Sequence, residues 1–231
     1  MERYQDINRK TIDRWVEEGW EWGIPISHEE YEDAKNGKWE VLLTPTRHVP
    51  HEWLGELKGK KVLGLACGGG QQMPIFSALG AECTVLDYSS KQIESELYVA
   101  KREGYQIHVI EGDMTKKLPF EEETFDIIFH PVSNCYIKDV QHVFHEAYRV
   151  LKKGGILLSG LGNEINYIVD KEEKEIIWKM PFDPLVDDKA KQFMLEEDCG
   201  MQFSHSMEEQ IGGQLKAGFL LADLYEDTNG S

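Results

Sequence analysis

The sequence predicts an α/β protein with a mostly parallel, doubly wound sheet covered by helices on both faces. Two observations support this. Short apolar runs alternate with amphipathic stretches long enough for helices from Lys61 onward, a rhythm typical of βαβ units and of strands buried on both faces. A cluster of glycines follows the first apolar run, where a strand turns into a helix. An N-terminal helical cap and an inserted lid are expected outside this core.

The elements follow from the apolar period and from capping residues. Strands are expected at residues 62–66, 82–86, 106–110, 125–129, 155–159 and 219–224. Helices are expected at residues 7–18, 27–36, 71–79, 89–103, 139–151 and 207–217. Ser27 and Ser89 each precede a Glu or Gln three residues later, which is the spacing of a capping box.

Four parts are therefore expected along the chain. They are an N-terminal helical cap (1–58), the α/β core (59–162), a lid or substrate region (163–205) and the end of the core (206–231). The lid is charged, contains Pro181 and Pro184, and breaks the alternation. Residues 227–231 have turn chemistry after the sixth strand, so a final strand is expected to be missing. Six strands would leave an edge for a partner chain or a missing tail to pair.

The composition limits the class of partner. Forty-two acidic against 25 basic residues give a formal charge of −17, which repels polyanions and argues against nucleic-acid binding. A small-molecule substrate is favoured. The sequence has no apolar run of membrane-spanning length and no signal-peptide start, so a cytoplasmic protein without membrane contact is expected. The sequence does not indicate an oligomeric state.

The four cysteines do not have the spacing of a metal site or of a redox pair. Their separation predicts buried, reduced thiols and no metal. They are Cys67, Cys83, Cys135 and Cys199.

Three sequence features are predicted to meet at one edge of the sheet. The glycine cluster runs from Gly64 to Gly70 and lets the backbone approach a ligand closely. Asp87 ends the second strand nineteen residues after Gly68, where an acid can accept hydrogen bonds from ribose hydroxyls. Asp113 follows the third strand. Because the carboxyl ends of parallel strands share one edge, a nucleotide-type ligand is expected there.

The motif series resembles that of class I S-adenosylmethionine-dependent methyltransferases, with their Rossmann-like core, in the branch of ubiquinone- and menaquinone-type small-molecule enzymes. The matching segments lie in order within residues 60–162, and their combination is specific. They are VLGLACGGG (62–70), VLDYS (85–89), EGDM (111–114), residues 120–128 and RVLKKGG (149–155).

The resemblance implies that S-adenosylmethionine is bound and its methyl group transferred in line to a small acceptor. The 66–70 loop would enclose the methionine moiety. Asp87 would bind the ribose, and Asp113 would bind the adenine amino group, with Met114 beside the adenine ring. The implied cofactor-binding residues are Ala66, Cys67, Gly68, Gly70, Gln72, Asp87, Tyr88, Ser89, Gln92, Gly112, Asp113, Met114, His130 and Val132. Ser133 and Asn134 are the implied substrate-binding residues.

Two roles are open for His130, which follows the fourth strand. It can act as a general base for an O–H or N–H nucleophile, or it can only line the cofactor pocket. Methyl transfer can also proceed by alignment and desolvation without a base. Gln71 and Gln72 can reach a ligand or remain solvated. Among the N-terminal tryptophans, most should pack the cap, and one or two can lie over the sulfonium.

Gly64 departs from the family pattern, which has an acid at this position. Another group would then meet the ammonium of the ligand, and a non-catalytic binding protein is one alternative. A short-chain oxidoreductase is a second alternative, because Tyr148 and Lys152 form a Tyr/Lys pair. That pair lies in a last helical turn, only about eighty residues after the glycine loop, which disfavours the oxidoreductase.

Overall fold

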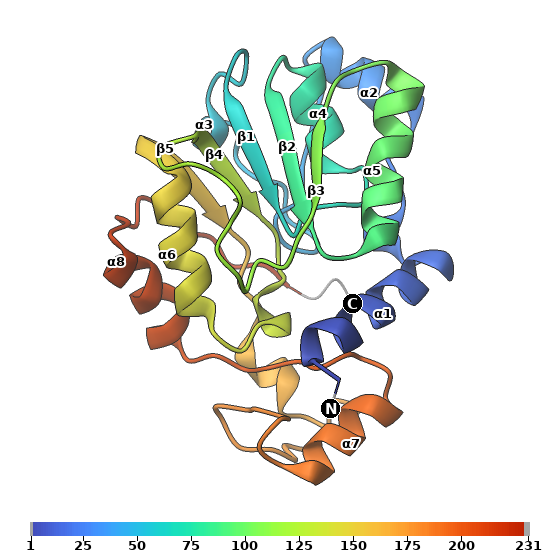
Figure 1. The fold of residues 1–231 in the computed structure, drawn as a ribbon, viewed down its shortest axis with the longest axis vertical. Helices are drawn as coiled ribbons and strands as arrows, with labels where there is room; N and C mark the ends of the chain where they lie inside the picture. Colours follow the sequence, from blue (N-terminus) through green and yellow to red (C-terminus); the bar gives the residue numbers. More distant parts are fainter. Residues whose placement is uncertain (1, 229–231) are drawn as a thin grey trace.

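The fold is a five-stranded parallel sheet in a computed structural model that describes residues 2–228. The strand order is β3-β2-β1-β4-β5 (Figure 1). The strands are β1 (Lys61–Leu65), β2 (Glu82–Asp87), β3 (His108–Glu111), β4 (Phe125–His130) and β5 (Leu151–Ser159). The order reverses between β1 and β4, so the carboxyl ends of these strands flank the switch point where open α/β sheets bind ligands.

Six of the helices occur close to where the sequence predicts them, whereas two others, His51–Leu54 and Asp188–Glu196, were not predicted. They are α1 (Tyr4–Glu17), α2 (His28–Lys35), α3 (His51–Leu54), α4 (Gln72–Ala78), α5 (Ser90–Glu103), α6 (Val140–Val150), α7 (Asp188–Glu196) and α8 (Gly213–Ala217). Ser27 forms the expected capping box with Glu30, and the Ser89 hydroxyl accepts from the Gln92 amide at the start of α5. A π-helical turn, Glu208–Gly212, precedes α8.

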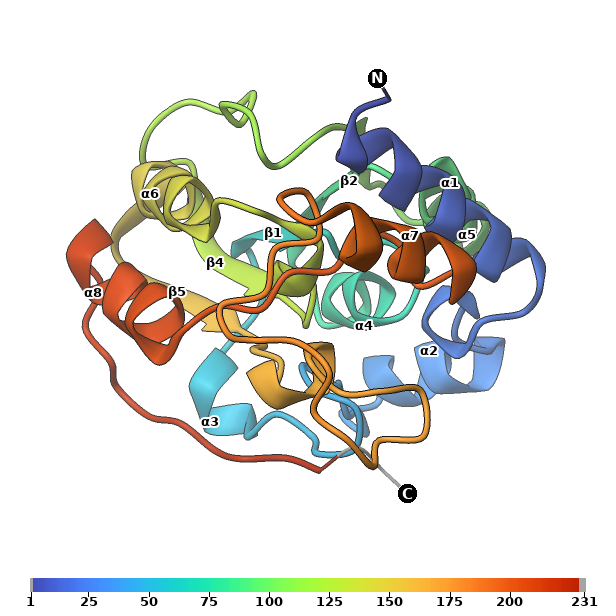
Figure 2. The same ribbon diagram turned by 90° about the horizontal axis from the view of Figure 1, so that it is seen from below.

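Alternate residues of the strands face two separate apolar layers. On β1, Val62 packs with the side chains of α4 and α5, whereas Leu63 and Leu65 pack with those of α6. All three side chains are fully buried. The helices therefore cover both faces of the sheet, and the predicted doubly wound, Rossmann-like architecture is confirmed (Figures 1 and 2).

The segment 163–205 and α1 lie together beyond the carboxyl ends of the strands (Figure 1). They share a third apolar cluster, in which Ile168, Met194 and Phe203 are buried and Tyr4 packs edge-on against Phe203, 5.1 Å between ring centroids. The segment contributes α7 and a short 3₁₀ turn, Glu164–Tyr167. We refer to residues 163–205 as the lid segment.

The prediction of a strand at residues 219–224 is wrong. The described residues form five strands, not six, and β5 is one of the two edges of the sheet. After Gly218, at φ +116°, the chain runs without strand pairing over residues 44–53. Asp223 accepts from the Trp53 indole at 3.1 Å, and Tyr225 stacks on Trp53 with centroids 5.2 Å apart. Polar and aromatic anchors therefore replace strand pairing. The predicted turn at 227–231 lies partly outside the described residues.

The tail also holds a loop of the N-terminal region. The Asp227 carboxylate accepts from the amides of Thr46 and Arg47 at 2.8 and 2.9 Å. The preceding residues of the same loop, 42–45, line the cavity described below. The tail thus fixes one wall of the cavity from outside.

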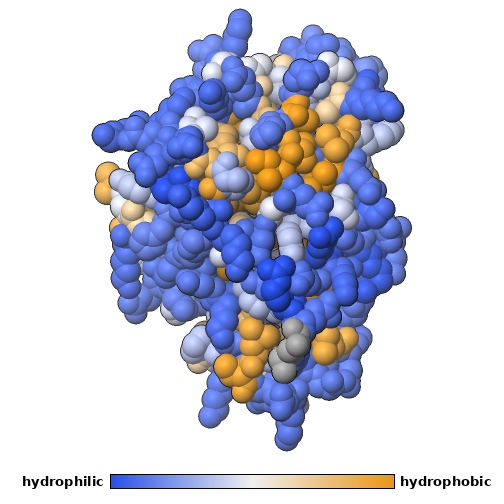
Figure 3. Space-filling view, in the orientation of Figure 1, coloured by the Kyte–Doolittle hydropathy of each residue, from blue (hydrophilic) through white to orange (hydrophobic). Residues whose placement is uncertain are grey.

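The surface seen in Figure 3 is mostly hydrophilic, in keeping with the charge of −17. Figure 3 shows a larger apolar patch in the upper half of this face and smaller ones at the lower end, where the lid segment lies. Ile176 and Val186 of the lid segment are exposed. No helix within residues 2–228 is long and apolar enough to cross a membrane.

The tail contact predicts a measurable contribution to stability. Tyr225→Ala removes the stack on Trp53 and should lower the free energy of unfolding by about 1–2 kcal/mol. Leu224→Ala is the matched control: its side chain is 58% exposed, so its loss should cost less than about 0.5 kcal/mol. Urea unfolding of both variants measures the difference, and equal losses would contradict the anchoring role.

Candidate active site

A cavity of about 330 Å³ lies at the carboxyl ends of β1, β2, β3 and β4. It receives side chains from the glycine loop, from the ends of these strands, from α1 and from residues 42–45. The sequence-predicted site residues that line it are Ala66, Cys67, Gly68, Gln72, Asp87, Tyr88, Ser89, Gln92, Gly112, Asp113, Met114, Val132 and Ser133. Gly70, His130 and Asn134 are not among the lining residues.

The glycine loop follows β1 and is pressed against α5. The Gly69 amide donates to the Gln92 carbonyl at 2.9 Å, and a Cβ on Gly68 would lie 2.7 Å from the Cβ of Gln92. Gly69 and Gly70 also have positive φ, +95° and +70°. A side chain at any of these positions would push the loop off the helix, so successive glycines are required here.

Ala66 holds a backbone conformation that the sequence did not reveal. It lies in the left-handed region at φ +50°, immediately after β1, with its amide donating to the Leu86 carbonyl at 2.8 Å. Non-glycine residues in this region carry strain and occur often at functional sites. Gly64 has a different requirement: a Cβ there would lie 3.0 Å from the Met73 sulfur and 3.2 Å from the Cβ of Cys67. The space next to Gly64 is therefore already filled.

Asp87 connects the loop to the end of β2. Its carboxylate accepts from the Gly68 amide and from the Ser89 amide, each at 2.9 Å. Burial raises the pKa of this carboxyl group, while the backbone hydrogen bonds oppose the shift. Asp87 thus holds the loop in place and still presents its side chain to the cavity.

Two buried oxygen acceptors at the cavity wall lack a hydrogen-bond partner among residues 2–228: Oδ2 of Asp113 and Oε1 of Gln92. The other Asp113 oxygen accepts from the Thr115 amide at 2.9 Å and from its hydroxyl at 2.6 Å. The nearest cation, Arg3, lies 3.7 Å from Oδ2, too far for a hydrogen bond. A buried acceptor without a partner costs free energy, so this wall is suited to a ligand that donates hydrogen bonds.

Helix α1 forms one wall of the cavity. Gln5, Asn8 and Ile12 line it. The Asp13 carboxylate accepts from the Ser89 hydroxyl at 2.6 Å and from the Lys91 amide at 3.1 Å, at the start of α5.

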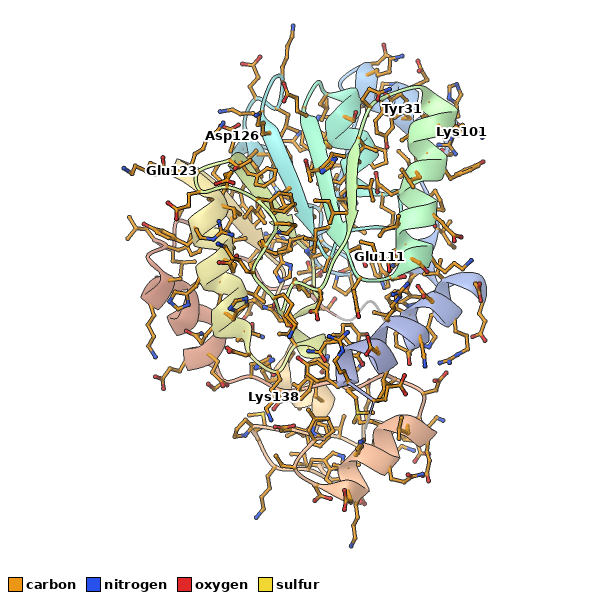
Figure 4. All side chains as sticks on the ribbon, in the orientation of Figure 1. Tyr31, Lys101, Glu111, Glu123, Asp126 and Lys138 are labelled. Atoms are coloured by element: carbon orange, nitrogen blue, oxygen red, sulfur yellow. The ribbon has the colours of Figure 1, made fainter. Side chains whose placement is uncertain are left out.

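A second set of contacts holds the first turns of α1. Arg9 forms an ion pair of 2.7 Å with Glu111, which Figure 4 labels at the lower end of β3. Asp6 accepts from the Tyr88 hydroxyl at 2.6 Å, and its contact with Arg3 holds its pKa well below the usual range. The only signal for these contacts in the sequence is the high density of charge in residues 2–14.

The structure places His130 away from the cavity lining. Its buried ring donates from Nδ1 to the Leu65 carbonyl at 2.9 Å, and Nε2 lies 2.8 Å from Oδ1 of Asn134. Burial lowers the pKa of this imidazole. Both nitrogens are occupied, so the geometry gives no support to a general base, and the role of His130 remains a prediction.

Asn134 belongs to the same buried chain instead of the cavity wall. Its Nδ2 donates to Oε1 of Gln210 at 2.9 Å, and Gln210 donates onward to Glu164 of the lid segment at 2.7 Å. The chain therefore connects the end of β4 to the lid segment. Asn134 does not line the cavity, so no direct contact supports a substrate-binding role for this residue.

Two of the N-terminal tryptophans, Trp20 and Trp22, line the cavity. The thiols of Cys67, Cys83 and Cys135 are buried and free, and burial raises their pKa values. A group of potential metal ligands, His28, Glu32 and Glu103, lies on α2 and α5 outside the cavity lining. His28 and Glu103 already bind each other at 2.8 Å.

A parallel sheet with this loop, two acids at adjacent strand ends and a cavity between them defines an α/β enzyme of the nucleotide-cofactor class. Residues 63–159 match the family described as "Methyltransferase domain". An uncharacterized methyltransferase of Bacillus subtilis is 42% identical over 96% of this chain and 90% of its own length. The chain therefore belongs to the methyltransferase family.

Two further relatives agree with this assignment. A sterol 24-C-methyltransferase of Pneumocystis carinii is 29% identical over 62% of this chain, which spans only 39% of that enzyme. The crystal structure of an S-adenosylmethionine-dependent methyltransferase from Mesorhizobium loti superposes with a TM-score of 0.55 at 18% identity. That match covers 73% of this chain and 77% of the other, and it shows the fold.

The strained position at Ala66 leads to a stability prediction. Ala66→Gly should leave the free energy of unfolding unchanged or raise it slightly, because relief of about 1 kcal/mol of strain offsets the extra freedom of the unfolded chain. Ala100→Gly, in the regular interior of α5, should instead cost about 1 kcal/mol. Thermal unfolding of the two variants compares them directly. A loss at position 66 as large as that at position 100 would show that Ala66 is unstrained.

Proposed function

We propose that this chain binds S-adenosylmethionine in the described cavity and transfers its methyl group to a small-molecule acceptor. The observation that carries the proposal is the unpartnered, buried Oδ2 of Asp113 at the cavity wall. An adenine amino group would supply the missing donor. Asp87 would accept from the ribose hydroxyls, and the tight loop at Gly68 would leave room for the methionine chain.

The bound cofactor would supply the activated methyl group. The contribution of the chain is then to orient the cofactor, to exclude water and to align an acceptor. Trp20 and Trp22 offer aromatic faces at the cavity, which suit a cation. Because His130 is held inside a buried chain of hydrogen bonds, proximity and desolvation carry the transfer better than a protein base does.

A small acceptor is supported by the chemistry of the surface and by the relatives. The charge of −17 disfavours nucleic acid. The related sterol 24-C-methyltransferase acts, by its name, on a small apolar molecule. Apolar lining residues such as Leu43, Val132 and Ile137 fit an acceptor with an apolar body.

The oxidoreductase alternative finds no support in the geometry. Tyr148 is 49% exposed and packs edge-on against Phe219, and Lys152 forms an ion pair with Asp126. Neither lines the cavity. A protein that binds S-adenosylmethionine without catalysis remains the competing hypothesis, which the transfer experiment below tests.

The binding part of the proposal is tested by Asp113→Asn. The amide keeps the shape and the contact with Thr115, but it would turn its NH₂ toward the adenine amino group. Affinity for S-adenosylmethionine in calorimetry should fall by between about fivefold and a hundredfold. Asp126→Asn, at the opposite end of the sheet (Figure 4), should leave the affinity unchanged. Equal affinities of the wild type and Asp113→Asn would contradict the adenine assignment.

The transfer part is tested with S-adenosylmethionine that carries a labelled methyl group. The wild type is incubated with a deproteinised cell extract of low molecular weight and, separately, with tRNA and with total protein. Label is expected in the small-molecule fraction. Binding of the cofactor without any transfer would favour the non-catalytic alternative, and label only in tRNA or protein would exclude the small acceptor.

A further inference from the structure

A fully buried carboxylate lies behind the glycine loop, on the side away from the cavity. Glu96, in the middle of α5, is 0% exposed. Its Oε2 accepts from the Gly70 amide at 3.0 Å, and its Oε1 accepts from the Tyr105 hydroxyl at 3.3 Å. Glu96 forms no ion pair with any Lys, Arg or His within residues 2–228. A buried carboxylate without a counter-charge is costly and calls for a reason.

The groups that face Glu96 are all neutral or acidic. They are Asp87 at the end of β2, Cys67 after β1, Cys83 in β2, and Tyr105, which stacks on Tyr31 of α2. The pKa of Glu96 is raised to about 8, mainly by burial and to a smaller extent by the nearby Asp87, while the hydrogen bonds from Gly70 and Tyr105 oppose the shift. Glu96 therefore changes its charge close to neutral pH.

Gly70 is the residue through which Glu96 contacts the glycine loop. At φ +70° it ends the run of glycines whose first member, Gly68, lines the cavity and binds Asp87. A Cβ on Gly70 would lie 2.9 Å from the Ser95 carbonyl, so no side chain fits between the loop and α5 at this position. Ionised Glu96 can strengthen its hydrogen bond with Gly70 without any change in the packing.

We propose that Glu96 is a positioning residue for the cofactor, whose ionised carboxylate fixes the Gly70 amide and supplies negative charge behind the loop. The inference rests on the proposed function, because the counter-charge is the cationic cofactor itself. The buried Glu96 and the partly buried Asp87 place two acids next to each other near the cavity, and a ligand with a sulfonium and an ammonium group complements them. Glu96 touches neither the ligand nor the reacting atoms.

The charge on Glu96 should affect stability and affinity in opposite directions. Its pKa is raised from 4.5 to about 8 in the folded protein, so folding retains a proton that the unfolded chain loses. The cofactor-free protein is therefore fully stabilised by this group below pH 4.5, loses that stability as the pH rises to about 8, and loses no more above it. Binding of a cation favours the ionised form, so affinity for S-adenosylmethionine rises over the upper part of the same range.

Glu96→Gln tests this inference, since the amide keeps the shape and removes the charge. The ratio of wild-type to variant affinity for S-adenosylmethionine, measured by calorimetry, should grow from about one at pH 6 to about tenfold near pH 8.5. The ratio cancels any titration of the ligand. Over the same range the cofactor-free variant should become more stable than the wild type. Glu94→Gln, on the exposed side of α5, is the matched control and should follow the wild type in both measurements.

The outcomes separate the two proposals. If the wild type does not bind S-adenosylmethionine, the proposed function fails. If the wild type binds and the affinity ratio stays constant with pH, the role of Glu96 fails while the function stands. A variant that is both less stable and weaker at every pH would show that Glu96 is only a structural residue, which also overturns the inference.

Discussion

The close contact between the glycine loop and α5 is the constraint on which the site depends. The backbone of residues 68–70 lies directly on Gln92, Ser95 and Glu96, with no space for a side chain between them. The same face of α5 binds the turn that carries Trp22: Gln92 donates to the Trp22 carbonyl at 3.2 Å, and Ser95 donates to the Gly23 carbonyl at 3.0 Å. One helix face thus positions both the loop and an aromatic wall of the cavity.

The closing elements are attached to the same helix or to the strands beside it. Asp13 of α1 binds the start of α5, so the same helix holds both α1 and the glycine loop in place at the cavity. The lid segment joins α1 through an apolar cluster and reaches β4 through Glu164, Gln210 and Asn134. The cavity is therefore lined by segments from the N-terminal region and from the lid segment as well as by the core.

The core was predictable because its signals are local. The apolar run of β1 and the helix caps at Ser27 and Ser89 can each be recognised within a few residues. The successive glycines by themselves indicate that the backbone of the loop lies close to another group. The strand at 219–224 was not predictable in the same way: its apolar run fits a strand, but Leu220 is 91% exposed and the anchors lie at Trp53 and Thr46, far away in sequence. His130 shows the same limit, because its partners Leu65 and Asn134 remove it from the cavity.

Glu96 is the clearest case of a residue whose role only the fold reveals. In the sequence it is one of several acids on an amphipathic helix, next to exposed Glu94. In the structure it is an acid with no contact to solvent and no partner cation, near a second, partly buried acid, Asp87. Such a pair lowers the stability of the cofactor-free protein at neutral and alkaline pH. Binding of a cationic ligand next to the two acids restores the stability that their charges remove. The electrostatics of the site therefore favour a cation over a neutral ligand of the same shape.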